Sequence, residues 1–398
     1  MFGSSLVQFA LVWWITQTVG TATALTIATL VGFVPQVILG PVAGALVDRW
    51  NRRLVMMVSD SIIALCVLAL AFLFSNGVAQ IWHIYVLMFI RSACGAFQWP
   101  AMQASTSLMV PKEQLTRVGG MNQTLQGLMG VLAPPAGALL IGVIPMQSVL
   151  LIDVVTAAIA VGCLFFVSIP QPEKKAADPA DMRNKPSLLQ DMREGLHFVA
   201  NWRAMFIIIL ISMLLNFVLT PAGSLMPLLV KQHFSGGATQ LATLEAALGI
   251  AIIAGGILLS TWGGFKRRML TSVIGVIGIG IGFLVVGLAP AHLFSMAVVG
   301  MGVLGLGQVL ANGAVIAIFQ TLIPHHMQGR VMSLVGSAAM LMTPLSLAIA
   351  GPVSDYIGLR VWYWIGGSVC VLVGIAMFFM RPVMNIETDA RPEVSIDK

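Results

Sequence analysis

The sequence predicts an all-α membrane protein with twelve transmembrane helices in two six-helix pseudo-repeats. The first observation is composition, because 58% of the 398 residues are hydrophobic and only 9% are charged, whereas soluble domains carry about 25% charged residues. The apolar segments are long and do not alternate as barrel strands do, so they indicate helices. The other two observations are the placement of the charges and an internal repeat.

Twelve runs with few or no charges follow one another along the chain, each close to the ~20 residues that a helix needs to cross the hydrocarbon. We place the helices at 1–19, 24–47, 54–75, 82–108, 117–142, 147–169, 204–230, 241–262, 269–288, 293–322, 331–354 and 359–380. The first has barely enough length and Met1 directly precedes its apolar residues. We therefore expect a helix 1 that is truncated at its N-terminus, and no signal peptide.

The basic residues lie almost entirely on one side of these helices. Eighteen of the 21 Lys and Arg fall in loops after even-numbered helices or in the C-terminal tail; the exceptions are Lys231, Arg360 and the intramembrane Arg91. By the positive-inside rule, those loops and both termini are cytoplasmic. The net charge of +6 therefore reports topology and not a nucleic-acid partner, and we expect a multi-pass protein of a bacterial plasma (inner) membrane.

A polar stretch divides the chain into two halves that echo each other. Pro324 lies 213 residues after Pro111, and Arg330 lies 213 residues after Arg117. Two six-helix repeats of the same orientation are a transporter architecture. The expected parts are an N-terminal bundle (1–170), a cytoplasmic linker with an amphipathic surface helix (171–203), a C-terminal bundle (204–381) and a cytoplasmic tail (382–398).

Several motifs carry a family resemblance that covers essentially the whole chain. Gly44-x3-Asp48-Arg49-x2-Arg52-Arg53 resembles motif A of the major facilitator superfamily. Arg91-x3-Gly95 is similar to its motif B, and Ala133-Pro134-x2-Gly137-Ala138 to motif C. The segments 192–198 and 328–333 are similar to the macrolide-efflux and enterobactin-exporter branch. The resemblance implies the major facilitator fold and a transporter rather than an enzyme.

Motif A implies a cytoplasmic latch. The resemblance places Asp48 against the N-terminus of helix 11, where unpaired N–H groups and the helix dipole favour a carboxylate. The latch residues are then Gly44, Asp48, Arg49, Arg52, Arg53 and Arg330. Asn51 replaces the motif A glycine, a mild change if the position needs left-handed backbone, which Asn tolerates. The alternative is that these charges only anchor the topology.

Two intramembrane charges offer a second site. Arg91 lies nine residues into helix 4, roughly 13 Å deep, where a guanidinium needs a partner or a water-filled cavity. Asp153, six residues into helix 6, lies within its reach. Either the two form a fixed ion pair, or Arg91 faces the cavity and Asp153 couples transport to protons, with Asp60 as the second candidate. Glu245 is placed at an outer helix end and is not assigned this role.

The resemblance implies that helices 1, 4, 7 and 10 line a substrate cavity near the midplane. The polar and aromatic residues on these helices are Gln8, Trp13, Gln98, Trp99, Asn216, Gln308 and Asn312. Amides also join helices to one another, which is the alternative. The glycine runs at 275–282 and 300–307 lack a following Lys-Ser/Thr, so they predict close helix contact and not a nucleotide loop.

We expect a proton-coupled exporter of amphipathic small molecules, such as a drug, a macrolide or a siderophore, that works by alternating access. Its partners are then its substrate, protons and the lipid bilayer, and we expect a monomer without cofactor or metal. An uptake symporter is one alternative, although it usually carries more buried charge. A non-transporting sensor or assembly partner built on the same fold is the other.

Overall fold

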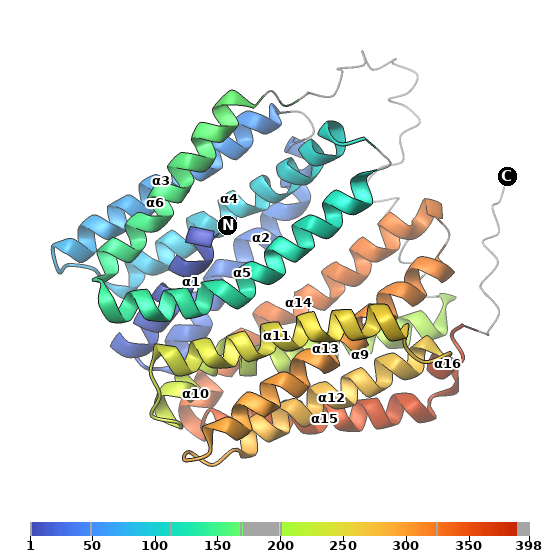
Figure 1. Ribbon diagram of the computed structural model, residues 1–398. Helices are drawn as coiled ribbons and strands as arrows, with labels where there is room; N and C mark the ends of the chain where they lie inside the picture. Colours follow the sequence, from blue (N-terminus) through green and yellow to red (C-terminus); the bar gives the residue numbers. More distant parts are fainter. Residues whose placement is uncertain are drawn as a thin grey trace. The chain divides into compact units, whose positions relative to one another are not determined.

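A computed structural model describes residues 2–47, 50–111, 114–167, 169, 199, 201–323 and 325–387. Every regular element in these ranges is a helix (Figure 1). Twelve of the helices described have 17 or more residues, and ten of the described helices are long and apolar enough to cross a membrane. The helical fold class predicted from the sequence is therefore confirmed.

The chain divides into two compact units. The first holds Met1–Glu173, Ser224–Ala246 and Leu347–Ile357; the second holds Lys174–Gly223, Ala247–Ser346 and Gly358–Lys398. Two pieces of the second half of the sequence thus belong to the first unit. The predicted surface helix near 187–202 lies almost entirely outside the described residues, and residues 388–398 of the predicted tail lie outside them as well.

The first unit is built around six long helices and one short one. They are α1 (Phe2–Thr18), α2 (Ala22–Val47), α3 (Arg52–Ser75), α4 (Ile81–Met109), α5 (Leu115–Val143), α6 (Met146–Phe166) and α10 (Met226–Gln232). α4 packs on α2 and α3, and α3 also packs on α6. α1 contacts α5, α6 and α10, so it has neighbours from both halves of the sequence.

Asn51 has a different role from the one expected of a glycine replacement. Its φ of −69° and ψ of 107° are extended backbone, and its side chain accepts a hydrogen bond from the Leu54 amide at 3.3 Å. The backbone is not left-handed here, so tolerance of that conformation is not the reason why Asn suits this position. Asn51 is the N-cap of α3, a position that favours Asn because its side-chain oxygen satisfies an unpaired amide.

The second unit contains most of the remaining helices. They are α9 (Arg203–Ser224), α11 (Ala238–Trp262), α12 (Arg268–Leu288), α13 (Phe294–Leu322), α14 (His325–Ile357), α15 (Arg360–Phe379) and α16 (Arg381–Met384), except that the start of α11 and the end of α14 belong to the first unit. α12 packs on both α13 and α15. A Cβ added to Gly282 of α12 would lie 2.7 Å from the carbonyl oxygen of Gly300 in α13. The backbones are in contact, which confirms the role predicted for the glycine runs.

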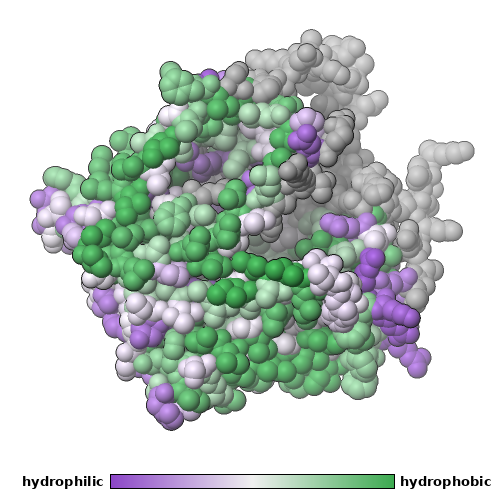
Figure 2. Space-filling view, viewed as in Figure 1, coloured by the Kyte–Doolittle hydropathy of each residue, from purple (hydrophilic) through white to green (hydrophobic). Residues whose placement is uncertain are grey.

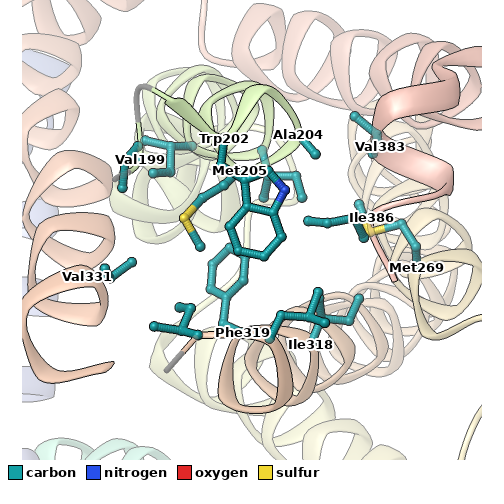
Figure 3. Packing of buried hydrophobic residues seen from close by; sticks show 14 of the residues in the cluster. Val199, Trp202, Ala204, Met205, Met269, Ile318, Phe319, Val331, Val383 and Ile386 are labelled. Carbon is teal, nitrogen blue, oxygen red and sulfur yellow. The ribbon is translucent and has the colours of Figure 1, made fainter. Parts of the chain in front are cut away.

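A cluster of buried apolar side chains holds one end of the second unit together. Trp202, Met205 and Phe319 lie in its middle, with Val383 and Ile386 at one side (Figure 3). Trp202 is 5% exposed and Phe319 2%. Close packing of such large side chains gains many van der Waals contacts, so this cluster fixes the residues around α16 to α9 and α13.

Two predicted helices differ from those observed by more than three residues at an end or by a break. The helix predicted at 204–230 is broken at Leu225 into α9 and α10. Pro227 stands in the first turn of α10; it has no N–H to continue the hydrogen bonds of α9, although it suits a helix start. The helix predicted at 331–354 is α14, which begins at His325 and ends at Ile357.

The surface matches a protein that lies in lipid. Figure 2 shows largely apolar side chains over the helices, with hydrophilic residues gathered at helix ends. Phe72 and Leu65 of α3 are 68% and 66% exposed, and Phe166 at the end of α6 is 87% exposed. Water would penalise so much exposed apolar surface, whereas hydrocarbon accepts it.

Candidate functional site

A cavity of about 230 Å³ opens in the first unit between α1, α5 and the start of α11. Its wall is mostly apolar, with an amide, a hydroxyl and a carboxyl. The lining residues are Ser5, Gln8, Phe9, Val12, Met129, Gly130, Ala133, Pro134 and Glu245. An apolar wall with a few polar groups is typical of small-molecule sites. Of the predicted site residues, the cavity brings together Gln8 and Pro134.

Glu245 is the functional candidate that sequence reasoning missed. α11 begins at Ala238, not at 241, so Glu245 lies about 10 Å along the helix and not at its end. The reason is local: the Gln240 side chain reaches back to accept a hydrogen bond from the Gly237 amide at 2.8 Å, as in a capping box. Gly237 followed by Gln240 three residues later was the available signal.

The motif C-like segment shapes the cavity wall. Ala133 and Pro134 line it directly, and Gly137, one turn further along α5, lies under Phe9 of α1. A Cβ on Gly137 would stand 2.8 Å from the Phe9 ring. Gly137 therefore allows α1 and α5 to approach and sets how far the Phe9 ring extends into the cavity.

The structure brings Arg91 and Asp153 together as an ion pair, which is the first of the two interpretations given above. Arg91 Nη1 lies 3.5 Å from Asp153 Oδ2, and the side chains are 15% and 4% exposed. Arg91 Nη2 donates to the Ser4 carbonyl at 3.0 Å, and Ser4 Oγ donates to Asp153 Oδ1 at 3.0 Å. The cluster thus connects α1, α4 and α6, and a role in proton coupling stays a prediction.

Asp60 and Gln98, predicted for different roles, contact each other. Gln98 Nε2 of α4 donates to Asp60 Oδ1 of α3 at 2.6 Å. The Gln98 amide therefore joins two helices of the first unit, as in the alternative interpretation of the amides.

The other predicted cavity residues are spread over both units. Trp13 is 2% exposed and Trp99 43% in the first unit. Asn216, Gln308 and Asn312 are exposed residues of the second unit, and Asn216 donates to the Ser212 carbonyl of its own helix at 2.9 Å. Their lining of a common cavity stays a prediction.

The motif A arginines that are described hold helices of the first unit together. Arg52, 7% exposed, donates from Nη1 to the Ala104 carbonyl of α4 at 3.0 Å. Arg53 donates to the Phe165 carbonyl of α6, and its guanidinium carbon lies 5.7 Å from the centroid of the Phe165 ring. The rest of the predicted latch lies outside what is described: Asp48 and Arg49 entirely, and the side-chain surroundings of Gly44 and Arg330.

Asp355 makes an unpredicted set of contacts at the start of α2. Its carboxylate, near the end of α14, accepts hydrogen bonds from the amides of Ala22 at 2.7 Å and Thr23 at 3.0 Å. Thr23 Oγ1 also donates to it, at 2.6 Å. The first amides of a helix lack partners within the helix and carry the positive end of its dipole, so the carboxylate stabilises this junction of α14 with α2.

Lys231 of α10 makes the complementary contact at the end of α1. Its Nζ donates to the carbonyls of Thr16 at 2.8 Å and Gln17 at 3.0 Å, where the helix dipole is negative. Gln232 Nε2 donates to the Gly20 carbonyl at 2.9 Å. The sequence showed Lys231 only as an exception to the charge asymmetry. A lysine on the side of the membrane that carries few basic residues was the signal in the sequence for this contact.

Sequence comparison accounts for the whole helical part of the chain. Residues 1–345 and 205–394 match the family model described as Major Facilitator Superfamily. The chain belongs to the major facilitator superfamily. It is therefore a multi-pass membrane transporter with the major facilitator fold, as the motifs predicted.

Particular members of the superfamily are similar to this chain. Macrolide efflux protein A of Streptococcus pyogenes is 31% identical over 384 residues, which cover 96% of this chain and 94% of that protein. The protein of the same name from Enterococcus faecalis is 33% identical over 328 residues, 82% of this chain and 100% of that protein. The inward open conformation of the xylose transporter XylE from E. coli superposes with a TM-score of 0.67 at 13% identity, covering 95% and 93% of the two chains. At that identity it supports the fold alone.

Proposed function

We propose that this major facilitator protein exports amphipathic small molecules, such as drugs, macrolides or siderophores, in exchange for protons. The cavity between α1, α5 and α11 carries the proposal. Its apolar wall and its few polar groups suit a molecule with much apolar surface. The similarity to macrolide efflux proteins over 96% of the chain supports both the export direction and the substrate class.

The proposal is tested by expression in an efflux-deficient bacterium. Expression should raise the inhibitory concentration of macrolides and lower the accumulation of an amphipathic dye, and a proton uncoupler should abolish both effects. The control is the same cell with an empty vector. Accumulation that expression leaves unchanged would reject export, and accumulation lowered equally with and without uncoupler would reject proton coupling.

We propose that transport proceeds by alternating access between two latches. The inner latch is that of motif A, between Asp48 and the start of α14, the eleventh of the predicted membrane helices. The outer contact is that of Asp355 and Lys231 with the facing ends of α2 and α1. In the inner latch, a charge from the first half of the sequence lies at a helix end of the second half. In the outer latch, charges from the second half lie at helix ends of the first half. Only one latch is closed at a time in the proposed cycle.

Asp153 is our proposed proton-coupling carboxyl, and Arg91 its partner. Their 3.5 Å contact supports a proton-dependent pair, because protonation of Asp153 would weaken it. Drug-induced pH changes in vesicles should be lost in Asp153→Asn. Asp60→Asn, which removes the second candidate, is the comparison. Coupling unchanged in Asp153→Asn would reject the assignment.

We also propose a bacterial plasma-membrane location, cytoplasmic termini and a monomeric state. The charge asymmetry of the loops supports the orientation, and the bacterial relatives support the location. A C-terminal green fluorescent protein should fluoresce, and alkaline phosphatase fused at the same position should be inactive. The reverse result would overturn the orientation. Light scattering of the purified protein measures the mass of the particle and so tests the monomer.

A further inference from the structure

Almost all of the described charged side chains of the first unit are compensated. Of its described acids, Asp153 contacts Arg91, Asp355 caps α2 and Asp60 accepts a hydrogen bond from Gln98. Among its described bases, Lys231 and Arg91 are likewise held by carbonyls or carboxylate. Glu245 is the remaining acid, and no hydrogen bond or ion pair connects its side chain to another residue within the described ranges.

An acid in this position needs a positive partner. Glu245 lies within a membrane-spanning helix and lines a cavity whose other members are uncharged. A carboxylate in such surroundings is costly unless a proton or a cation neutralises it. None of the described residues that line the cavity is basic, so what neutralises Glu245 at this wall is a proton or a cation that displaces it.

The rest of the cavity wall indicates what kind of cation fits. Besides Glu245, only Ser5 and Gln8 among the lining residues carry polar side chains, which is too few oxygen atoms to replace the water ligands of a small hydrated ion such as Na⁺. The other side chains of the wall are apolar: Phe9, Val12, Met129, Ala133 and Pro134. They suit a charge that already carries apolar substituents, as in a substituted ammonium or phosphonium group. An aromatic ring such as that of Phe9 also attracts such cations.

We propose that Glu245 and the cavity around it form the subsite for the charged group of a lipophilic organic cation. This rests on the proposed export function and names a class of substrate within it. The cavity of about 230 Å³ is smaller than the ~300–1,000 Å³ of sites that enclose whole drug-sized ligands. The subsite therefore holds the cationic part of a larger amphipathic molecule.

Equilibrium binding of radiolabelled tetraphenylphosphonium to the purified full-length protein tests the subsite without relying on transport. This probe is permanently charged, and the neutral triphenylphosphine oxide carries three of the same phenyl rings on phosphorus, with an oxygen in place of the fourth. The wild type should bind the cation, and the oxide should compete poorly. Glu245→Gln should weaken binding at least about tenfold, because it removes a charge–charge attraction at short range. Glu245→Asp should retain more affinity than Glu245→Gln.

Glu387→Gln is the matched control, because it removes one negative charge in the second unit, where Glu387 faces Arg268 at 4.0 Å. Binding by this variant should equal that of the wild type. Thermal melting of each variant confirms folding. Equal affinities of Glu245→Gln and wild type would overturn the subsite, as would equal competition by the neutral oxide.

The transport assay separates this inference from the export proposal. Glu245→Gln should lose export of the phosphonium while retaining export of a neutral amphipathic substrate. Binding that depends on Glu245 in a protein that exports nothing would leave the subsite standing and reject export. Export of the phosphonium that is undiminished in Glu245→Gln would leave export standing and reject the subsite.

Discussion

At the scale of single residues, Arg91 and Asp153 show how a buried charge is retained in a membrane helix. Arg91 contacts a carboxylate and a backbone carbonyl, and Asp153 contacts both the guanidinium and the Ser4 hydroxyl. Removing one partner leaves the other buried without compensation, which costs about 3–5 kcal/mol, whereas replacing both by apolar groups can be nearly neutral.

We therefore predict strong non-additivity between the two positions. Arg91→Met and Asp153→Leu should each lower the melting temperature substantially, and the double variant should be more stable than the sum of the two losses implies. Fluorescence-detected size-exclusion chromatography after heating measures this. Additive losses would show that the two side chains do not depend on each other for stability.

At the scale of elements, the contact of α1 with α5 decides the width of the cavity. Gly137 lies under Phe9 with no space for a Cβ, whereas the Cβ position of Gly142 in the same helix is open. The two glycines therefore respond differently to the same substitution, although each replacement by Ala favours the helix by about 1 kcal/mol.

Gly137→Ala should displace the Phe9 ring and reduce export of bulky substrates more than that of small ones. Gly142→Ala should leave export of both unchanged. Accumulation of two dyes that differ in size, in cells with matched expression, measures the effect. The prediction fails if Gly137→Ala and Gly142→Ala export the bulky dye equally well.

Helix positions were predictable from the sequence because charge-free length is a strong requirement of the bilayer. The ends of α3 and α12 were predicted within two residues, as were those of α15. The break at Leu225 was missed because the residues on either side are equally apolar. Asp355 and Thr23 lie 332 residues apart in the sequence, so hydropathy alone does not predict their contact. The depth of Glu245 was missed because the start of α11 is set by a single helix cap.

At the scale of the whole molecule, the two proposed latches set the balance between outward-open and inward-open states. α2 has Asp48 just beyond one end and receives Asp355 at the other. A charge at a helix end is worth about 0.3–1 kcal/mol, and up to ~2 kcal/mol in partly buried geometries. Losses of that size change an equilibrium between two states severalfold.

Asp48→Asn and Asp355→Asn should therefore shift this balance in opposite directions. The native cysteines are first replaced by serine, and Ser5→Cys then places one thiol in the cavity wall. The rate at which a membrane-impermeant maleimide added outside labels this thiol measures access to the cavity from outside. Asp355→Asn should speed its labelling and Asp48→Asn should slow it, with insertion unchanged. Glu387→Gln is the control. Shifts in the same direction for both variants would contradict reciprocal latches.

A carboxyl in the cavity wall that takes a cation, as proposed for Glu245, has a consequence for membrane voltage. When the same number of protons is exchanged, export of a monovalent cation moves one more positive charge outward than export of a neutral compound. An interior-negative potential opposes that charge by about 2.3 kcal/mol per 100 mV. In vesicles clamped with potassium and valinomycin, interior-negative voltage should slow export of the phosphonium relative to that of the neutral substrate. Cells with a large resting potential would then clear the neutral members of a drug series more completely than the charged ones.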